Sequence, residues 1–157
     1  MNIYDDKRAY MVLLRSEHRD VNEILCHIST LVRPLGDPLT NDSRLAQVVE
    51  HLAHLRQELK RHFLVDESGG CLDGCLDEAV ARCPSIGREV DTIKGEHPRL
   101  MEQLDALINQ ATCIAEGSSE QSDFSQQWER FVAELSNHED AEDRLLVRGL
   151  ESVPTEI

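Results

Sequence analysis

The sequence predicts an all-α protein folded as an up-down-up-down four-helix bundle. Four long stretches repeat apolar residues at steps of three and four, which is the period of an amphipathic helix. Breaks rich in proline, glycine and serine separate these stretches, and short connections between long helices favour antiparallel neighbours. Only 4% of the residues are aromatic, and we find no alternation of apolar and polar residues typical of a strand.

The first helix is expected from about residue 6 to residue 32. It stops at the break 33–39, whose two prolines and one glycine cannot continue a helix. The second begins near residues 40–43, a run of N-cap residue types, and ends by the glycine pair at 69–70. A short helical piece is expected at 72–82.

The third long helix is expected to begin at Pro84, because proline is tolerated in a first helical turn. It runs to Gly117. The fourth helix opens after a serine-rich break, where Asp123 and Gln126 have the spacing of a capping box, and closes near Gly149.

Length and charge restrict the possible functions. The 157 residues suit a single domain, with the bundle at about 6–150 and a short tail at 151–157. Subtracting 30 acidic from 16 basic residues gives a net charge of −14. Nucleic acids and anionic membranes both require a positively charged surface, so neither partner is expected. An acidic protein can, however, bind cations.

The apolar run at residues 10–14 is too short for a signal-peptide core or a membrane span, so a cytoplasmic location is expected. The cysteines are five, an odd number, and are expected to be thiols. Cys71 and Cys75 lie one helical turn apart. They are either a redox pair that responds to oxidants or small, partly buried residues.

The apolar stripe of every long helix contains one histidine, and these are His18, His62, His97 and His138. Asp66 and Glu142 each follow one of these histidines by four residues, on the same helix face and one turn along. Counted from the expected helix ends at 1.5 Å per residue, each antiparallel pair differs in depth by roughly 7 Å. Four imidazoles and two carboxylates should therefore converge in one layer of the bundle.

A single histidine on an apolar stripe is most often a core residue with one hydrogen-bond partner. Four at one depth, beside two buried acids, favour a metal site, because burying an unpaired carboxylate costs several kcal/mol. The remaining histidines lie off the stripes, as ordinary surface or boundary residues do: His27, His51 and His54.

Imidazole and carboxylate ligands suit iron, zinc or manganese. Six ligands are too many for one tetrahedral zinc ion. Two metal ions bridged by Asp66 and Glu142, each with two terminal imidazoles, would use all six residues, and iron is the expected occupant. A ferritin-like di-iron bundle is excluded, because it needs glutamate three residues before histidine and none of the seven histidines has one.

Over nearly its whole length the sequence resembles the bacterial hemerythrin-like (HHE cation-binding) domains. The resemblance is carried, in order, by the segments 17–19, 62–67 followed by 69–70, 96–97 and 138–143. It implies a non-haem centre of two iron ions, carboxylate- and oxo- or hydroxo-bridged, that binds dioxygen, nitric oxide or peroxide. The implied ligands are His18, His62, Asp66, His97, His138 and Glu142.

Three positions depart from the oxygen-carrying members of that family. Met101 stands where they have a second histidine on the third helix, which puts reversible oxygen carriage in doubt. Both acidic positions are doubled, so Glu67 or Asp143 could replace the carboxylates four residues after the histidines. Pro98 directly follows His97, so the third helix is expected to kink at its own ligand.

The expected function is the binding or sensing of dioxygen or a related small ligand, with any signal passed to an unknown protein partner. The alternatives are a di-iron oxidoreductase that turns over peroxide, oxygen or nitric oxide, iron buffering, and a helical interaction module without metal. Glu58 and Glu134 lie one turn before His62 and His138. They either orient these ligands or are solvated surface acids.

Overall fold

The computed structural model describes residues 3–32, 41–67, 80, 83–116 and 123–151. Within these ranges, side chains are described at 12, 15–32, 44–63, 80, 83–116 and 123–149. The described chain is almost entirely helical and contains no strand. Its elements are α1 (Ile3–Val32), α2 (Asn41–Glu67), the 3-10 turn η2 (Pro84–Ile86), α4 (Gly87–Ala115) and α5 (Phe124–Glu151).

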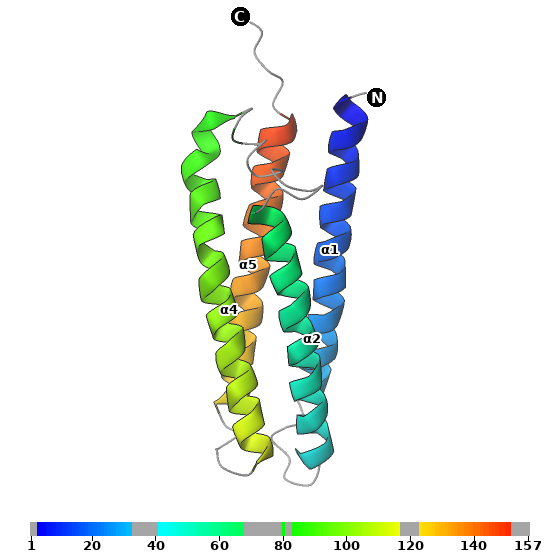
Figure 1. The fold of residues 1–157 in the computed structure, drawn as a ribbon, viewed down its shortest axis with the longest axis vertical. Coiled ribbons are helices and arrows are strands. Elements are labelled where there is room, and N and C mark those ends of the chain that lie inside the picture. Colours follow the sequence, from blue (N-terminus) through cyan, green and yellow to red (C-terminus); the bar gives the residue numbers. More distant parts are fainter. Residues whose placement is uncertain (1–2, 33–40, 68–79, 81–82, 117–122, 152–157) are drawn as a thin grey trace, which may run out of the picture.

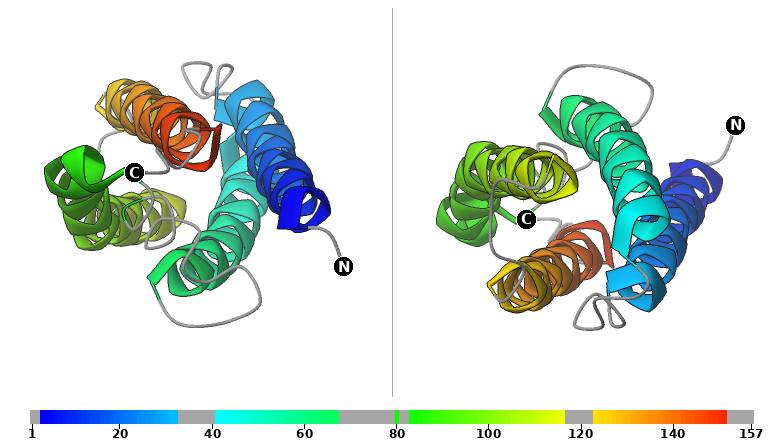
Figure 2. Two further views of the ribbon diagram at one scale, coloured as in Figure 1. Left: turned by 90° about the horizontal axis from the view of Figure 1, so that it is seen from above. Right: turned by 90° about the horizontal axis from the view of Figure 1, so that it is seen from below.

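The four long helices form an up-down-up-down bundle, as the sequence predicts (Figure 1). Viewed along the bundle they follow the order α1, α2, α4, α5 around a common centre (Figure 2). Each helix packs against the next one in this order, and α5 also packs against α1. None of the described helices combines the length and apolar character that crossing a bilayer requires.

The helix boundaries follow the expected ones closely. Pro84 lies in the first turn of a helical segment that continues through η2 into α4, which is the position where proline is tolerated. Pro98 lies inside α4, and the helix continues through it. The kink expected at this position stays a prediction. The short helical piece expected at 72–82 falls, except for residue 80, outside the described residues.

Two apolar clusters fill the bundle. The larger cluster joins all four helices and includes the aromatic side chains of Phe124, Trp128 and Phe131. Trp128 donates its indole N–H to Ser29 Oγ at 3.0 Å, so its buried polar atom is satisfied. The smaller cluster joins the start of α4 to the end of α5 through Ile86, Val90, Ile93, Leu145 and Leu146. The layer between the clusters is therefore flanked by apolar side chains above and below.

Candidate metal centre

Five polar side chains fill the layer between the two apolar clusters. One histidine comes from each long helix, and each is at most 5% exposed: His18, His62, His97 and His138. Glu142 of α5 is fully buried among them, at 0% exposure. The helix periodicity that predicted one histidine per apolar stripe thus places all four in the interior of the bundle.

The buried side chains form two groups of three that share one member. The ligand atoms of His18, His62 and Glu142 lie within 4.8 Å of one another, and so do those of His97, His138 and Glu142. One histidine pair comes from α1 and α2, and the other from α4 and α5. A carboxylate common to two such groups has the placement of a bridge between two metal ions.

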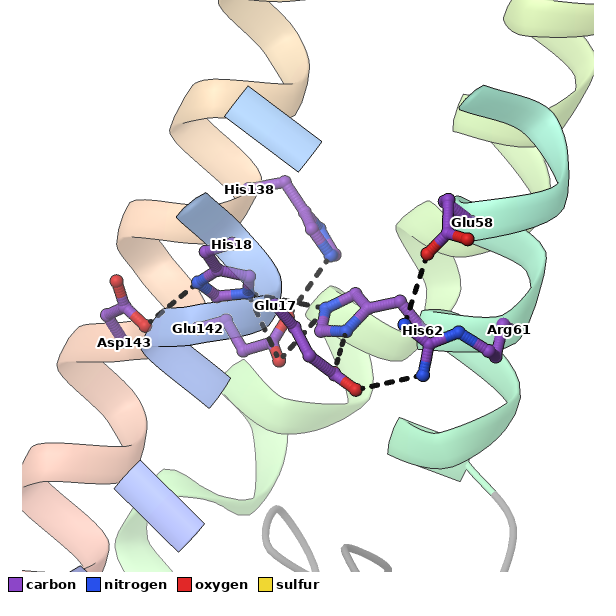
Figure 3. Close-up of polar contacts among 8 residues, drawn as sticks. All are labelled: Glu17, His18, Glu58, Arg61, His62, His138, Glu142 and Asp143. Carbon is purple, nitrogen blue, oxygen red and sulfur yellow. Dashed lines mark hydrogen bonds and ion pairs between the residues drawn. The ribbon is translucent and has the colours of Figure 1, made fainter. Parts of the chain in front are cut away.

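The two oxygens of Glu142 face different histidines. Its Oε1 lies 3.9 Å from His18 Nε2 and 3.8 Å from His62 Nε2. Its Oε2 lies 3.5 Å from His138 Nε2. Figure 3 shows three of the imidazoles converging on this carboxylate from three helices. Ions bound at about 2.0–2.2 Å fit between nitrogens and oxygens at these separations.

The outward nitrogens of three histidines face carboxylates. Nδ1 of His62 lies 2.8 Å from Glu17 Oε2, and Nδ1 of His138 lies 3.1 Å from Glu96 Oε2. Nδ1 of His18 lies 3.2 Å from Asp143 Oδ1. A carboxylate at Nδ1 favours the tautomer that carries its proton there. The Nε2 lone pair is then directed inward, as a metal ligand requires.

Glu17 is itself held in place from both sides. Its Oε1 accepts a hydrogen bond from Arg61 at 3.1 Å, while Arg61 also donates to Glu58 at 3.1 Å. The hydrogen bond from His62 lowers the pKa of the Glu17 carboxyl, against the opposing effect of burial. Glu17 is therefore an ionised acceptor that strengthens His62 as a ligand.

The alternative that Glu58 and Glu134 orient the ligands is wrong. Glu58 binds Arg61, and Glu134 accepts a hydrogen bond from Gln103 at 2.7 Å. The acids that contact His62 and His138 are instead Glu17 and Glu96. The error has a geometric cause, because a glutamate one turn before a histidine on the same helix lies above it rather than beside its ring edge.

The acids that sequence analysis missed follow a simple pattern. Glu17 directly precedes His18 on α1 but contacts the histidine of α2. Glu96 directly precedes His97 on α4 but contacts the histidine of α5. Neighbours in sequence lie about 100° apart around a helix, so the residue beside a core position is directed toward the adjacent helix. The Glu-His pairs at 17–18 and 96–97 were the sequence feature from which these two acids could have been identified as partners of the histidines.

An aromatic ring sets the position of His97. Phe63 of α2 stacks on the imidazole with ring centroids 4.1 Å apart and planes 9° from parallel. The same ring meets His138 edge-on at 5.7 Å. His97 is thus in place although Pro98 follows it. Met101, one turn further along, packs against the larger apolar cluster instead of adding a ligand.

The structure describes the side chains at one of the two doubled acidic positions, 142–143, and not those at the other, 66–67. On α5, Glu142 lies in the buried layer and Asp143 lies outside it, against His18 Nδ1. The helix spacing that favours the residue four after His138 agrees with this arrangement. On α2, the side chains of Asp66 and Glu67 lie outside the described part of the chain, so the second predicted carboxylate ligand remains a prediction.

The buried polar atoms fit a metal ion. Among the described side chains, neither oxygen of Glu142 has a hydrogen-bond partner, nor does Nε2 of His138. Burial alone would raise the pKa of the Glu142 carboxyl, but the close contact with His138 Nε2 at 3.5 Å and the charges of the surrounding imidazoles lower it, so the carboxyl is ionised. An ionised, unpartnered carboxylate among imidazole lone pairs is a donor set for a cation.

Glu139 is a further buried acid beside the layer. It is 4% exposed, and its Oε1 has no hydrogen-bond partner among the described side chains. Burial raises the pKa of this carboxyl to about 7 despite the opposing effect of the nearby histidines. Sequence analysis gave Glu139 no role, since it stands one residue off the apolar stripe.

Replacing Glu17 with glutamine is expected to weaken metal binding by about 10–100-fold, because His62 loses the acceptor that orients its ring and raises its basicity. The dissociation constant can be measured by titrating the chain with cobalt(II) and following its absorption. Glu134→Gln is the matched control, since it removes a half-buried glutamate that contacts no histidine. Equal weakening in both variants would contradict the assigned role of Glu17.

No protein-family model matches the sequence, and no curated protein or solved structure is significantly similar to it. The arrangement of buried imidazoles and carboxylates is therefore the observation from which function is inferred. The chain forms a four-helix bundle that contains two buried His/Glu groups, and each group could hold a metal ion.

Proposed function

We propose that this protein is a dinuclear non-haem iron protein, similar to the hemerythrin-like domains, that binds or senses dioxygen or a related small ligand such as nitric oxide or peroxide. The supporting observation is that Glu142 belongs to both buried ligand groups, with one oxygen toward each. Histidines that only filled the apolar core would not require a buried carboxylate without a hydrogen-bond partner between their two pairs.

Each ion would have its own pair of imidazoles. His18 and His62 would hold one ion, His97 and His138 the other, and Glu142 would bridge them. Asp66 would be a second bridging carboxylate, as the family resemblance implies. Iron in such a site supplies open coordination positions for a small ligand and one-electron exchange between the ferrous and ferric states.

The surroundings of the layer favour a small ligand. Apolar clusters lie on both sides of it, and Phe63 covers His97 and approaches His138. A groove of about 360 Å³ between α4 and α5 is lined by Ile93 and by Glu96, the direct partner of His138. Because Met101 packs against the larger apolar cluster and supplies no ligand on α4, an ion held by His97 and His138 would keep room for a small ligand.

One observation favours the second candidate, a di-iron oxidoreductase that turns over peroxide, oxygen or nitric oxide. Reduction of peroxide or oxygen consumes protons, and these have to reach a buried site. The Glu139 carboxyl lies beside the layer, 4% exposed and with its Oε1 lacking a hydrogen-bond partner among the described side chains, so it is placed to pass a proton to the site. Turnover that falls strongly in Glu139→Gln, at unchanged iron content, would favour this candidate over simple binding.

Anaerobic loading with ferrous iron, followed by desalting, tests the proposal. We expect about two iron ions per wild-type chain, and nitric oxide titration of the loaded protein should produce the absorption bands of an iron–nitrosyl species. The variant His62→Ala should retain less iron and bind less nitric oxide. Less than half an ion per chain, unchanged by His62→Ala, would contradict the proposed function.

A further inference from the structure

The three histidines outside the buried layer lie together in one surface groove. The groove runs between α1 and α2 and has a volume of about 500 Å³. Its polar lining consists of three histidines and three acids, namely Asp20, Glu23, His27, His51, His54 and Glu58. From the sequence these histidines are ordinary surface or boundary residues, and periodicity within one helix cannot show that they meet across two.

Two of these imidazoles direct the same ring nitrogen at each other. Nε2 of His27 lies 3.2 Å from Nε2 of His51, with ring centroids 4.5 Å apart and planes 86° from parallel. Two imidazoles on one tetrahedral ion, at the usual bond length of about 2.0–2.1 Å, have their nitrogens about 3.3 Å apart. The pair therefore has the separation that a shared metal ion requires, with little movement of either helix.

The charge of the groove also favours a cation. Glu23 lies one turn before His27 on α1, and His54 lies three residues after His51 on α2. Residues three or four apart are neighbours on a helix surface, so either side chain can add a third ligand by a change of rotamer. The lining contains no lysine or arginine. Glu58 adds less negative charge to the groove than the other acids, because it is paired with Arg61.

The geometry points to a second metal site, in which His27 and His51 bind one divalent transition-metal ion such as zinc on the outside of the bundle, completed by Glu23 or His54 and water. It is separate from the buried centre, since His27 is nine residues from His18 and His51 eleven from His62, or roughly 13–17 Å along the helices. The ion would join α1 to α2 and exchange readily with solvent. This inference does not depend on the proposed function.

Zinc bound per chain, measured by equilibrium dialysis, tests the site in four full-length proteins: wild type, His27→Gln, His51→Gln and Glu50→Gln. Glu50 is the matched control, because it is exposed next to His51 but does not line the groove. We expect each histidine variant to bind about one ion fewer than wild type, and Glu50→Gln to bind the same amount. The same comparison in a Glu142→Gln background separates the outer site from the buried one.

Two further results bear on the inference. In the Glu142→Gln background, zinc should raise the unfolding temperature, and adding His27→Gln should remove this increase, since a bound ion stabilises only the folded chain. In nitrogen-15 spectra, zinc should shift the ring resonances of both His27 and His51. Zinc binding that is unchanged by His27→Gln and His51→Gln, or lost in only one of them, would overturn the site.

Discussion

Glu142→Gln is expected to reduce the metal content of anaerobically iron-loaded protein from about two ions per chain to one or fewer. Glu142 is the only described side chain shared by both buried groups, so its loss removes a ligand from both ions at once. A neutral amide also removes the negative charge that offsets two cations in a buried layer, and burial makes that charge more important than it would be in water. Iron and protein assays on desalted samples measure the change.

The matched control is Asp140→Asn. It removes an exposed carboxylate two residues earlier on the same helix and should leave the iron content unchanged. His97→Ala is expected to remove one ion, because it affects one of the two groups only. If Glu142→Gln retained two ions per chain, the bridging role of Glu142 would be wrong.

Each ion bound at the buried centre is expected to raise the unfolding temperature by roughly 5–10 °C. An ion present at 100 times its dissociation constant stabilises the folded state by about 2.7 kcal/mol, provided that it does not bind the unfolded chain. In a domain of this size each kcal/mol corresponds to roughly 2–4 °C. Differential scanning calorimetry of chelated and reloaded protein measures the shift. His27→Gln should be present in every sample, so that only the buried centre contributes.

The increase in unfolding temperature caused by metal loading should become smaller as the pH falls below neutral. Burial alone would lower the pKa of His18, but Asp143 and Glu142 outweigh it and raise the pKa, so His18 takes up a proton at a higher pH than a free imidazole. A protonated imidazole cannot bind a metal, and protons therefore compete with the ion. The chain with both His62→Ala and Glu142→Gln should show no increase at any pH. An equal increase in that chain would show that the stabilisation comes from elsewhere.

The helix pattern was predictable because it is local. Apolar residues recur every three or four positions along each helix, and a histidine that occupies such a position must face the interior wherever the helix packs. This is why His18, His62, His97 and His138 could be assigned to one layer before the structure was known. The spacing of four residues likewise favoured Glu142 over Asp143, because the former shares a face with His138, although the sequence left Asp143 as an alternative.

Contacts between helices could not be predicted in the same way. Glu17 and Glu96 stand beside the apolar stripes, and whether they reach a histidine of the next helix depends on how the two helices are rotated and shifted against each other. Each residue step turns about 100° and rises 1.5 Å along a helix. A small rotation or shift of one helix against the other therefore brings a different residue next to the histidine.

The sequence by itself determined the all-α bundle, the order of its helices, the four buried histidines and the buried carboxylate on the last helix. Only the tertiary structure decided which nitrogen of each imidazole faces inward, which acids hold the outer nitrogens, and that Glu142 presents one oxygen to each histidine pair. It also brought His27 and His51 together across α1 and α2. Helix periodicity fixes the direction of a side chain on its own helix, whereas a ligand set is assembled from several helices at once.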